Sequence, residues 1–269
     1  MEDRARPWLA SPANFIRIDS RPFAVNLPEQ SIHPMNVLAL GAHPDDIEIL
    51  CAGTLALCAQ AGHTVFIGVF TSGNMGDLKV PPDELARVRK TEAEASAAIL
   101  GARLLWPGVT DELVFPNEAQ RRLMIDLLRE ADPDVILTHS PNDYHPDHRY
   151  VSQLVFDSYF QKGLPHLPGQ QRPACRFSQA QVYYLDNLGG IGFQPTEYVD
   201  ITSTMDAKRR MLECHQSQVK PMRELAHTDL LDLVEIQSRF RGFAAGCRYA
   251  EGFTRLEAYQ RGLTRRVLP

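Results

Sequence analysis

Two segments of the chain contain histidine, proline and aspartate in the same order. The chain reads His-Pro-Asp-Asp over residues 43–46 and His-Pro-Asp-His over residues 145–148. A catalytic zinc needs three nitrogen or oxygen ligands from the protein and an open position for water, and two histidines with one carboxylate also suit other divalent metals. A further carboxylate beside them could take a proton from that water. The two segments together predict a metal-dependent site, although the residues alone do not decide whether Asp45 or Asp46 binds the metal.

Each segment also has a purely structural interpretation. A His-Pro-Asp-Asp sequence can form a turn in which an aspartate caps the following helix, and Asp147 can begin the next helix in the same way. Taken alone, either segment fits a turn as well as it fits a metal site. The same motif after two strands of one sheet is much harder to explain by turns, so we favour the metal site.

Short apolar runs alternate with helical patterns, and this alternation predicts the framework that carries both segments. We expect strands at residues 37–40, 65–70, 103–105, 135–138, 182–185 and 198–199. We expect helices at residues 48–61, 83–100, 118–131, 145–160, 203–217 and 229–240. This order is typical of an α/β fold, here a Rossmann-like, mostly parallel sheet with helices on both faces. Ligands bind such sheets where strands end, which is where both motifs fall.

The two motifs must meet at one site, so the sequence between them belongs to one domain. We therefore expect a single domain over residues 35–269. It is preceded by an irregular arm over residues 1–34, which contains five prolines and no sustained periodicity. No G-x-G-x-x-G motif follows the first strand, and no G-x-x-x-x-G-K-[ST] motif occurs, so the usual phosphate-binding loops are absent.

The composition of the chain limits the kinds of molecule that the protein is expected to bind. The 269 residues include 28 Lys and Arg against 33 Asp and Glu, a formal net charge of −5, which argues against binding to nucleic acid. The five cysteines form no C-x-x-C pair, so we expect reduced thiols rather than a disulfide framework. We find no signal peptide and no membrane span, and we expect a cytoplasmic protein with a small-molecule partner.

The order of these motifs resembles the LmbE/PIG-L family of metal-dependent de-N-acetylases, which act on N-acetylglucosamine-type amides. The resemblance begins with Ala-His-Pro-Asp-Asp-x-Glu over residues 42–48 and covers about residues 36–253. It includes a T-x-G-x-x-G loop at 71–76, an R-x-x-E helix at 89–92, an H-x-S-Q segment at 215–218 and a Y-A-E-x-F segment at 249–253. The loop departs from the family pattern because Asn74 stands where glutamate is common.

The resemblance implies a role for individual residues. His43, Asp46 and His148 would be the metal ligands, and Asp45 the general base. His145 would stabilise the oxyanion of the tetrahedral intermediate and could act as the general acid. We also expect three substrate-binding residues: Arg89, Asn74 and Asp111.

The implied activity is a zinc-dependent hydrolase that removes an acetyl group from an N-acetylglucosamine-type amide and yields acetate and a free amine. Zn²⁺ is the expected cofactor, and another divalent metal such as Fe²⁺ is the alternative. The expected partner is an N-acetylated amino sugar or glycoconjugate, and a homo-oligomer is an open expectation.

Three alternatives compete with this interpretation. An iron-dependent oxygenase uses two histidines and a carboxylate, but usually on an all-β scaffold. A non-catalytic sugar- or nucleotide-binding protein could share the fold, but it would not need Asp45 as a base. A metal-dependent hydrolase of a different amide or ester remains open. Two further histidines are ambiguous: His139 could orient a metal ligand, and His215 could reach the site or only pack against it.

Overall fold

The central strand explains how the sheet is built. Residues 36–41 form β1 (Asn36–Gly41), in which Val37 and Ala39 face one side of the sheet and Leu38 and Leu40 face the other. Such a run, apolar on both faces, is typical of a strand buried between two layers of helices. The computed structural model describes residues 34–169, 171–176, 180–225 and 227–258.

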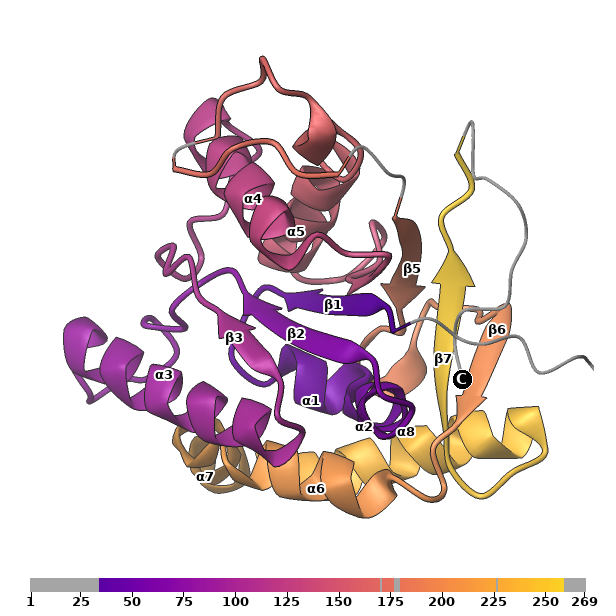
Figure 1. Cartoon of the computed structure of the whole chain (residues 1–269). Coiled ribbons are helices and arrows are strands. Elements are labelled where there is room, and N and C mark those ends of the chain that lie inside the picture. The colour runs from indigo at the N-terminus through magenta and orange to yellow at the C-terminus, as the bar shows by residue number, and fades with distance from the viewer. Residues whose placement is uncertain (1–33, 170, 177–179, 226, 259–269) are drawn as a thin grey trace, which may run out of the picture. The chain divides into compact units, whose positions relative to one another are not determined.

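Seven strands form one mixed sheet in the order β3-β2-β1-β4-β5-β7-β6 (Figure 1). Strands β1 to β5 are parallel, whereas β7 runs antiparallel to both of its neighbours, β5 and β6. Besides β1, the strands are β2 (Thr64–Val69), β3 (Arg103–Leu105), β4 (Val135–Thr138), β5 (Gln181–Leu185), β6 (Glu197–Asp200) and β7 (Ala250–Arg255).

Helices cover both faces of the sheet, as the alternating pattern predicts (Figure 1). One face packs against α4 (Glu118–Ala131) and α5 (Pro146–Phe156). The other face packs against α1 (Asp46–Leu50), α2 (Ala52–Gln60), α3 (Pro82–Ile99), α6 (Met205–Glu213), α7 (Gln216–Leu225) and α8 (Leu230–Ala245). Two short 3-10 turns, η1 (Gln161–Gly163) and η2 (Leu188–Gly190), complete the elements. The predicted fold class is confirmed.

The order of the strands places the two His-Pro-Asp motifs side by side. Strand β1 pairs with β2 on one side and with β4 on the other, and Leu40 is paired with Thr138. The direction in which strands are added therefore reverses between β1 and β4, and a crevice opens at the carboxyl ends of such a pair. The loop after β1 carries the first motif and the segment after β4 carries the second, so the predicted meeting of the two segments is confirmed.

Besides shifts at element ends, such as α8, which continues to Ala245 rather than ending at residue 240, three elements differ from the expectation. The helix expected at 48–61 begins earlier, at Asp46, and is divided at Cys51 into α1 and α2. The helix expected at 203–217 ends at Glu213, and α7 follows as a separate helix. Strand β7 was not predicted, because alanine, glutamate and glycine are poor strand formers; it forms by pairing with β5 and β6.

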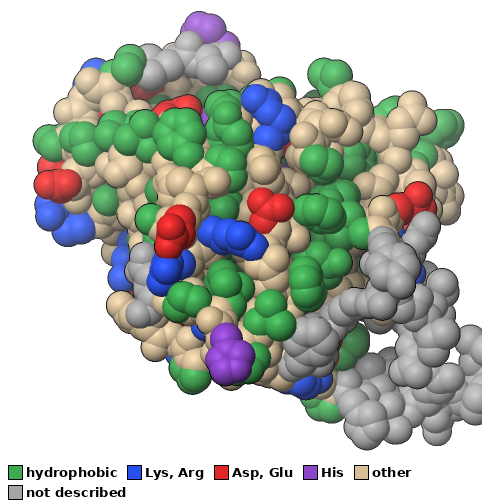
Figure 2. Space-filling model, turned by 90° about the horizontal axis from the view of Figure 1, so that it is seen from above, with side chains coloured by type: hydrophobic (Ala, Val, Ile, Leu, Met, Phe, Trp, Pro, Cys, Tyr) green, Lys and Arg blue, Asp and Glu red, His purple; other side chains and the backbone are tan. Residues whose placement is uncertain are grey.

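The surface, the cysteines and the extent of the described residues bear on the remaining expectations. On the face shown in Figure 2, basic side chains lie apart from one another and among acidic ones. Within the described residues, no helix is long and apolar enough to cross a membrane. The five cysteines are free thiols, and Cys51 and Cys58 are buried. The described residues belong to one compact unit that begins at Pro34, and the predicted arm over residues 1–34 lies outside them except for Pro34 itself.

Candidate active site

The backbone after β1 turns two adjacent aspartates in different directions. Asp45 has φ 112° and ψ −22°, a conformation that non-glycine residues rarely adopt, and α1 begins immediately after it at Asp46. The Asp45 side chain makes no capping hydrogen bond, so the turn does not serve to cap the helix. Gly41 allows the start of α1 to lie this close to the end of β1, since a Cβ atom at Gly41 would lie 2.9 Å from Cβ of Asp46. A strained backbone of this kind is characteristic of functional sites.

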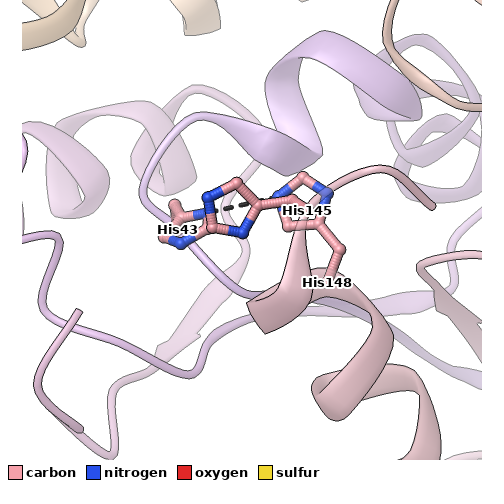
Figure 3. Close-up of side chains that lie close together, drawn as sticks. All are labelled: His43, His145 and His148. Carbon is pink, nitrogen blue, oxygen red and sulfur yellow. Dashed lines mark hydrogen bonds between the residues drawn. The ribbon is translucent and has the colours of Figure 1, made fainter. Parts of the chain in front are cut away.

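His43 and His148 present one ring nitrogen each to the same point. Nδ1 of His43 lies 3.1 Å from Nε2 of His148, and both rings point toward each other across the crevice (Figure 3). The opposite nitrogen of each ring faces carboxylates: Nε2 of His43 lies 3.0 Å from Oδ1 of Asp111 and 3.3 Å from Oδ2 of Asp147. Nδ1 of His148 lies 3.0 Å from Oδ1 of Asp143. These partners favour a proton on the outer nitrogen and leave the inner lone pairs free for a metal.

Asp46 provides a carboxylate at the same point. Its Oδ1 lies 3.3 Å from Nε2 of His148, and its Oδ2 lies 3.5 Å from Nδ1 of His43. Oδ2 also accepts hydrogen bonds from the amides of Ala42 at 2.9 Å and His43 at 2.7 Å. The three predicted ligands are thus brought together, with Asp46 oriented by the backbone of the loop that carries it.

The charges at this point favour a cation. Burial opposes a charge on the imidazole of His148, but Asp46 and Asp143 outweigh it and raise the pKa of His148 to about 9. In the same way, burial is outweighed at His43, where Asp46 and Asp111 raise the pKa well above its usual value. Burial would raise the pKa of Asp46, but the charges of the histidines, chiefly His148, hold it well below its usual range. A metal cation competes with protons for these lone pairs and benefits from the same carboxylates.

Asp45 lies beside these ligands but not among them. It is buried and lines a cavity of about 240 Å³ together with His43, Asp46 and His148. Burial, followed by repulsion from Asp46, raises the pKa of Asp45 to about 7. Within the described part of the chain, no residue donates a hydrogen bond to its carboxylate. A carboxyl group that can change its protonation state near neutral pH is suited to proton transfer.

His145, the residue immediately before α5, approaches the same cavity. Its ring lies edge-on to His43 with centroids 4.6 Å apart, and Nδ1 accepts a hydrogen bond from the amide of Asp147 at 3.2 Å. Nε2 therefore carries the proton in the neutral ring, and it lies 3.3 Å from Oε1 of Glu112. Burial, then the charges of His43 and His148, lowers the pKa of His145. The ring is thus placed as a neutral hydrogen-bond donor.

Arg89 from α3 forms a wall of the cavity. Its side chain is buried, and its Nη2 donates to Oε1 of Gln218 on α7. The T-x-G-x-x-G loop wraps around the guanidinium, because a Cβ atom at Gly73 or at Gly76 would lie 2.6 Å from a nitrogen of Arg89. Nε of Arg89 is buried without a hydrogen-bond partner in the described residues. The motif therefore holds a buried cation at the wall of the cavity.

The other two predicted substrate-binding residues behave differently from each other. Asp111 lines the cavity and also faces His43. Asn74 does not line the cavity; its side-chain oxygen accepts a hydrogen bond from the amide of Asp111 at 3.0 Å. Asn74 therefore fixes the loop that carries Asp111, and the structure does not bring its side chain to the pocket.

Several residues of the site were missed in the sequence. The cavity is also lined by Tyr144, Glu112, Leu188, Gln218, Met222 and Leu230. A local signal existed only for Gln218, which belongs to the H-x-S-Q segment. The neighbouring Ser217 bonds Glu92 of the R-x-x-E motif through its amide at 2.8 Å and its hydroxyl at 2.5 Å. Hydrogen bonds between these two sequence motifs therefore hold α3 and α7 together.

The structure also shows where the two ambiguous histidines, His139 and His215, lie. His215 does not line the cavity; it is buried with Nε2 3.2 Å from Oε1 of Glu48, which also accepts a hydrogen bond from Ser96 at 2.5 Å. His139 is fully buried and contacts Asp46 and His148 directly. The structure thus favours packing for His215 and a supporting position for His139.

Comparison with known proteins identifies the family. The model of the family described as PIG-L, GlcNAc-PI de-N-acetylase, matches residues 38–159. Diacetylchitobiose deacetylase of Thermococcus kodakarensis is 30% identical over 249 residues, which cover 86% of this chain and 85% of that protein. The 4-oxalmesaconate hydratase of Pseudomonas putida is 24% identical over 210 residues, 72% of this chain and 76% of that protein.

Solved structures agree with the sequence matches. N,N'-diacetylchitobiose deacetylase from Pyrococcus horikoshii superposes with a TM-score of 0.71 and 27% identity, covering 86% of this chain and 87% of that one. The chain belongs to the PIG-L family, as its motifs predicted. The expected enzyme class, an N-deacetylase that acts by hydrolysis, is confirmed with it.

Proposed function

We propose that the chain is a zinc-dependent de-N-acetylase that removes the acetyl group of an N-acetylglucosamine-type amide. The observation that carries the proposal is the convergence of two imidazole lone pairs and one carboxylate beside Asp45, at the wall of a cavity. The deacetylase relatives support the substrate class, since they are named for N-acetylated sugars.

The proposed ligands fit zinc in both chemistry and spacing. Donor atoms around a tetrahedral zinc with bonds of about 2.0–2.1 Å lie about 3.3 Å apart. Here Nε2 of His148 lies 3.1 Å from Nδ1 of His43 and 3.3 Å from Oδ1 of Asp46. When bound, the metal would polarise the acetamide carbonyl and lower the pKa of a water molecule. Because two histidines and a carboxylate also bind ferrous iron, Fe²⁺ is the alternative metal.

Asp45 is proposed as the general base. Its buried carboxylate faces the cavity, and its pKa of about 7 matches a group that must accept and release a proton near neutral pH. Asp45 would accept the proton of the attacking water and pass it to the departing amine. Asp46, and not Asp45, makes the close contacts with His43 and His148, so Asp45 is left outside the proposed ligand set.

His145 is proposed to stabilise the oxyanion. Since Nδ1 accepts the amide of Asp147, Nε2 is the nitrogen that can donate a hydrogen bond into the cavity. A fixed donor of this kind stabilises the negative charge that develops on the carbonyl oxygen. The resemblance also implies a role as general acid, but these contacts favour a neutral ring, which stabilises the oxyanion by donating a hydrogen bond and keeps its proton.

Arg89 and Asp111 are proposed to hold the sugar. Together they offer buried donors and an acceptor on the cavity wall, a combination that suits neighbouring hydroxyl groups. An N-acetylated amino sugar or glycoconjugate is therefore the proposed partner. The cytoplasmic location, the homo-oligomer and the domain boundary near residue 35 stay predictions.

Acetate release from a panel of compounds tests the proposed reaction. Zinc-loaded protein should release acetate from at least one of N-acetylglucosamine, diacetylchitobiose and an inositol glycoside of N-acetylglucosamine, with one free amine formed per acetate. The same samples should be assayed for hydration of 4-oxalmesaconate, because the hydratase relative makes water addition the competing reaction. Hydration without acetate release from any amide would contradict the proposal.

A further inference from the structure

His139, the first residue after β4, touches two of the three proposed metal ligands. Its side chain is fully buried. Its Nε2 lies 3.0 Å from Oδ2 of Asp46, and its ring stacks on that of His148 with centroids 3.8 Å apart and planes 8° apart. Among the described residues, Nδ1 of His139 has no hydrogen-bond partner. The polar contacts of the ring are therefore made by Nε2, which faces Oδ2 of Asp46 and the amide of Ala42.

The hydrogen bonds around Oδ2 of Asp46 show which atom carries the proton. The amide of Ala42 lies 2.9 Å from this oxygen and 3.0 Å from Nε2 of His139, but it has only one hydrogen to donate. A bond to a carboxylate is charge-assisted and is the stronger of the two. The amide then donates to Asp46, and His139 carries a proton on Nε2 that it also donates to Asp46.

In this arrangement the two carboxylate oxygens of Asp46 have different partners. Oδ2 accepts from the amides of Ala42 and His43 and from His139, so three donors occupy it. Oδ1 instead faces Nε2 of His148 at 3.3 Å, on the side where the metal donors converge. With Oδ2 occupied, Asp46 would present a single oxygen to a metal and keep the number of protein donors at three.

We propose that His139 is a positioning residue that makes Asp46 a one-oxygen ligand and holds the ring of His148 in place. The inference rests on the proposed metal site and assigns its geometry to a residue outside the ligand set. Partners of this kind that orient ligands typically change metal affinity by about 10- to 100-fold when they are removed.

Two substitutions separate the hydrogen bond from the stacking. His139→Phe keeps a flat ring against His148 but cannot donate to Asp46, and we expect its zinc Kd to rise by about 10- to 100-fold. His139→Gln can still donate from its amide, so we expect it to recover most of the affinity. The exposed His166 provides the matched control, and His166→Gln should leave the Kd unchanged. The Kd is measured by competition with a chromogenic chelator.

Cobalt spectroscopy adds a readout that a merely structural role would not change. If Oδ2 of Asp46 is freed in His139→Phe, the coordination number rises, and the intense visible bands of four-coordinate Co²⁺ should weaken while those of His139→Gln persist. The melting temperature of each metal-free variant shows whether it folds. Wild-type zinc affinity and a wild-type cobalt spectrum in folded His139→Phe would overturn the inference. Failure of the wild type to bind zinc would instead overturn the proposed metal site and this inference together.

Discussion

Replacing Asp45 by asparagine should lower kcat for acetate release by about 10²- to 10⁴-fold, the usual contribution of a general base. Zinc should still bind at one ion per chain, because Asp45 lies outside the proposed ligand set. Asparagine has nearly the same shape, so the cavity should keep its form. The measurement is acetate release under saturating substrate, with zinc content determined on the same samples.

The same substitution should stabilise the metal-free protein. Burial, then repulsion from Asp46, raises the pKa of Asp45 from 3.8 to about 7, so its ionised form destabilises the fold. This cost is absent at low pH and grows as pH rises from about 4 towards 7. Metal-free Asp45→Asn should therefore unfold at a higher temperature than the wild type, and the difference should widen over this pH range. One pKa unit corresponds to about 1.4 kcal/mol, which sets the scale of the gain.

A surface control separates these effects from a general change of charge. Asp206 is exposed, and Asp206→Asn should leave kcat unchanged. Near-wild-type kcat in a zinc-containing Asp45→Asn protein would contradict the assigned role. An unchanged melting temperature of metal-free Asp45→Asn at pH 7 would contradict the claim that the ionised Asp45 carboxylate destabilises the fold.

Replacing Lys208 by methionine should have the largest effect on stability. Lys208 and Glu251 are 1% and 2% exposed, and Nζ lies 2.5 Å from Oε1 of Glu251. The lysine also donates to the carbonyl of Ile49 at 2.8 Å. Removal of one partner leaves an uncompensated buried charge, which typically costs about 3–5 kcal/mol. Urea denaturation of the metal-free protein should show this loss in the free energy of unfolding.

A double variant and a surface lysine make this prediction specific. Lys208→Met combined with Glu251→Gln leaves no buried charge, so it should be less destabilised than Lys208→Met alone. Lys90 forms an exposed pair with Glu94 at 4.0 Å, and Lys90→Met should change the free energy of unfolding by less than about 1 kcal/mol. A loss of less than about 1 kcal/mol in Lys208→Met would contradict the importance of the buried pair.

Glu251 also explains why one helix could not be predicted correctly. The sequence from residue 48 to 61 has a continuous helical pattern, yet the chain breaks at Cys51. The new helix begins where the carboxylate of Glu251 accepts the amides of Gly53 at 3.0 Å and Thr54 at 2.8 Å. This cap comes from a residue 197 positions away from Thr54, so no local pattern contains it.

The site was predictable to the extent that its residues carry local motifs. The paired His-Pro-Asp segments at two predicted strand ends placed both segments in one crevice, and the family resemblance then singled out His43, Asp46 and His148 as the metal ligands. The supporting carboxylate of Asp143 and the amide of Gln218 were not found, because their roles depend on which side chain from another element faces them. Asn74 shows the reverse case, since its loop was identified but its side chain turns to the backbone of Asp111.

Stepwise addition of zinc to chelator-treated protein tests the central proposal most directly, with acetate release measured at each step. Activity should be absent without metal, rise in proportion to added zinc and level off at one ion per chain. His148→Ala, which lacks one proposed ligand, should show no such rise over the same zinc range. Full activity in protein that holds less than about a tenth of an equivalent of any divalent metal would contradict a metal-dependent deacetylase site between the two His-Pro-Asp segments.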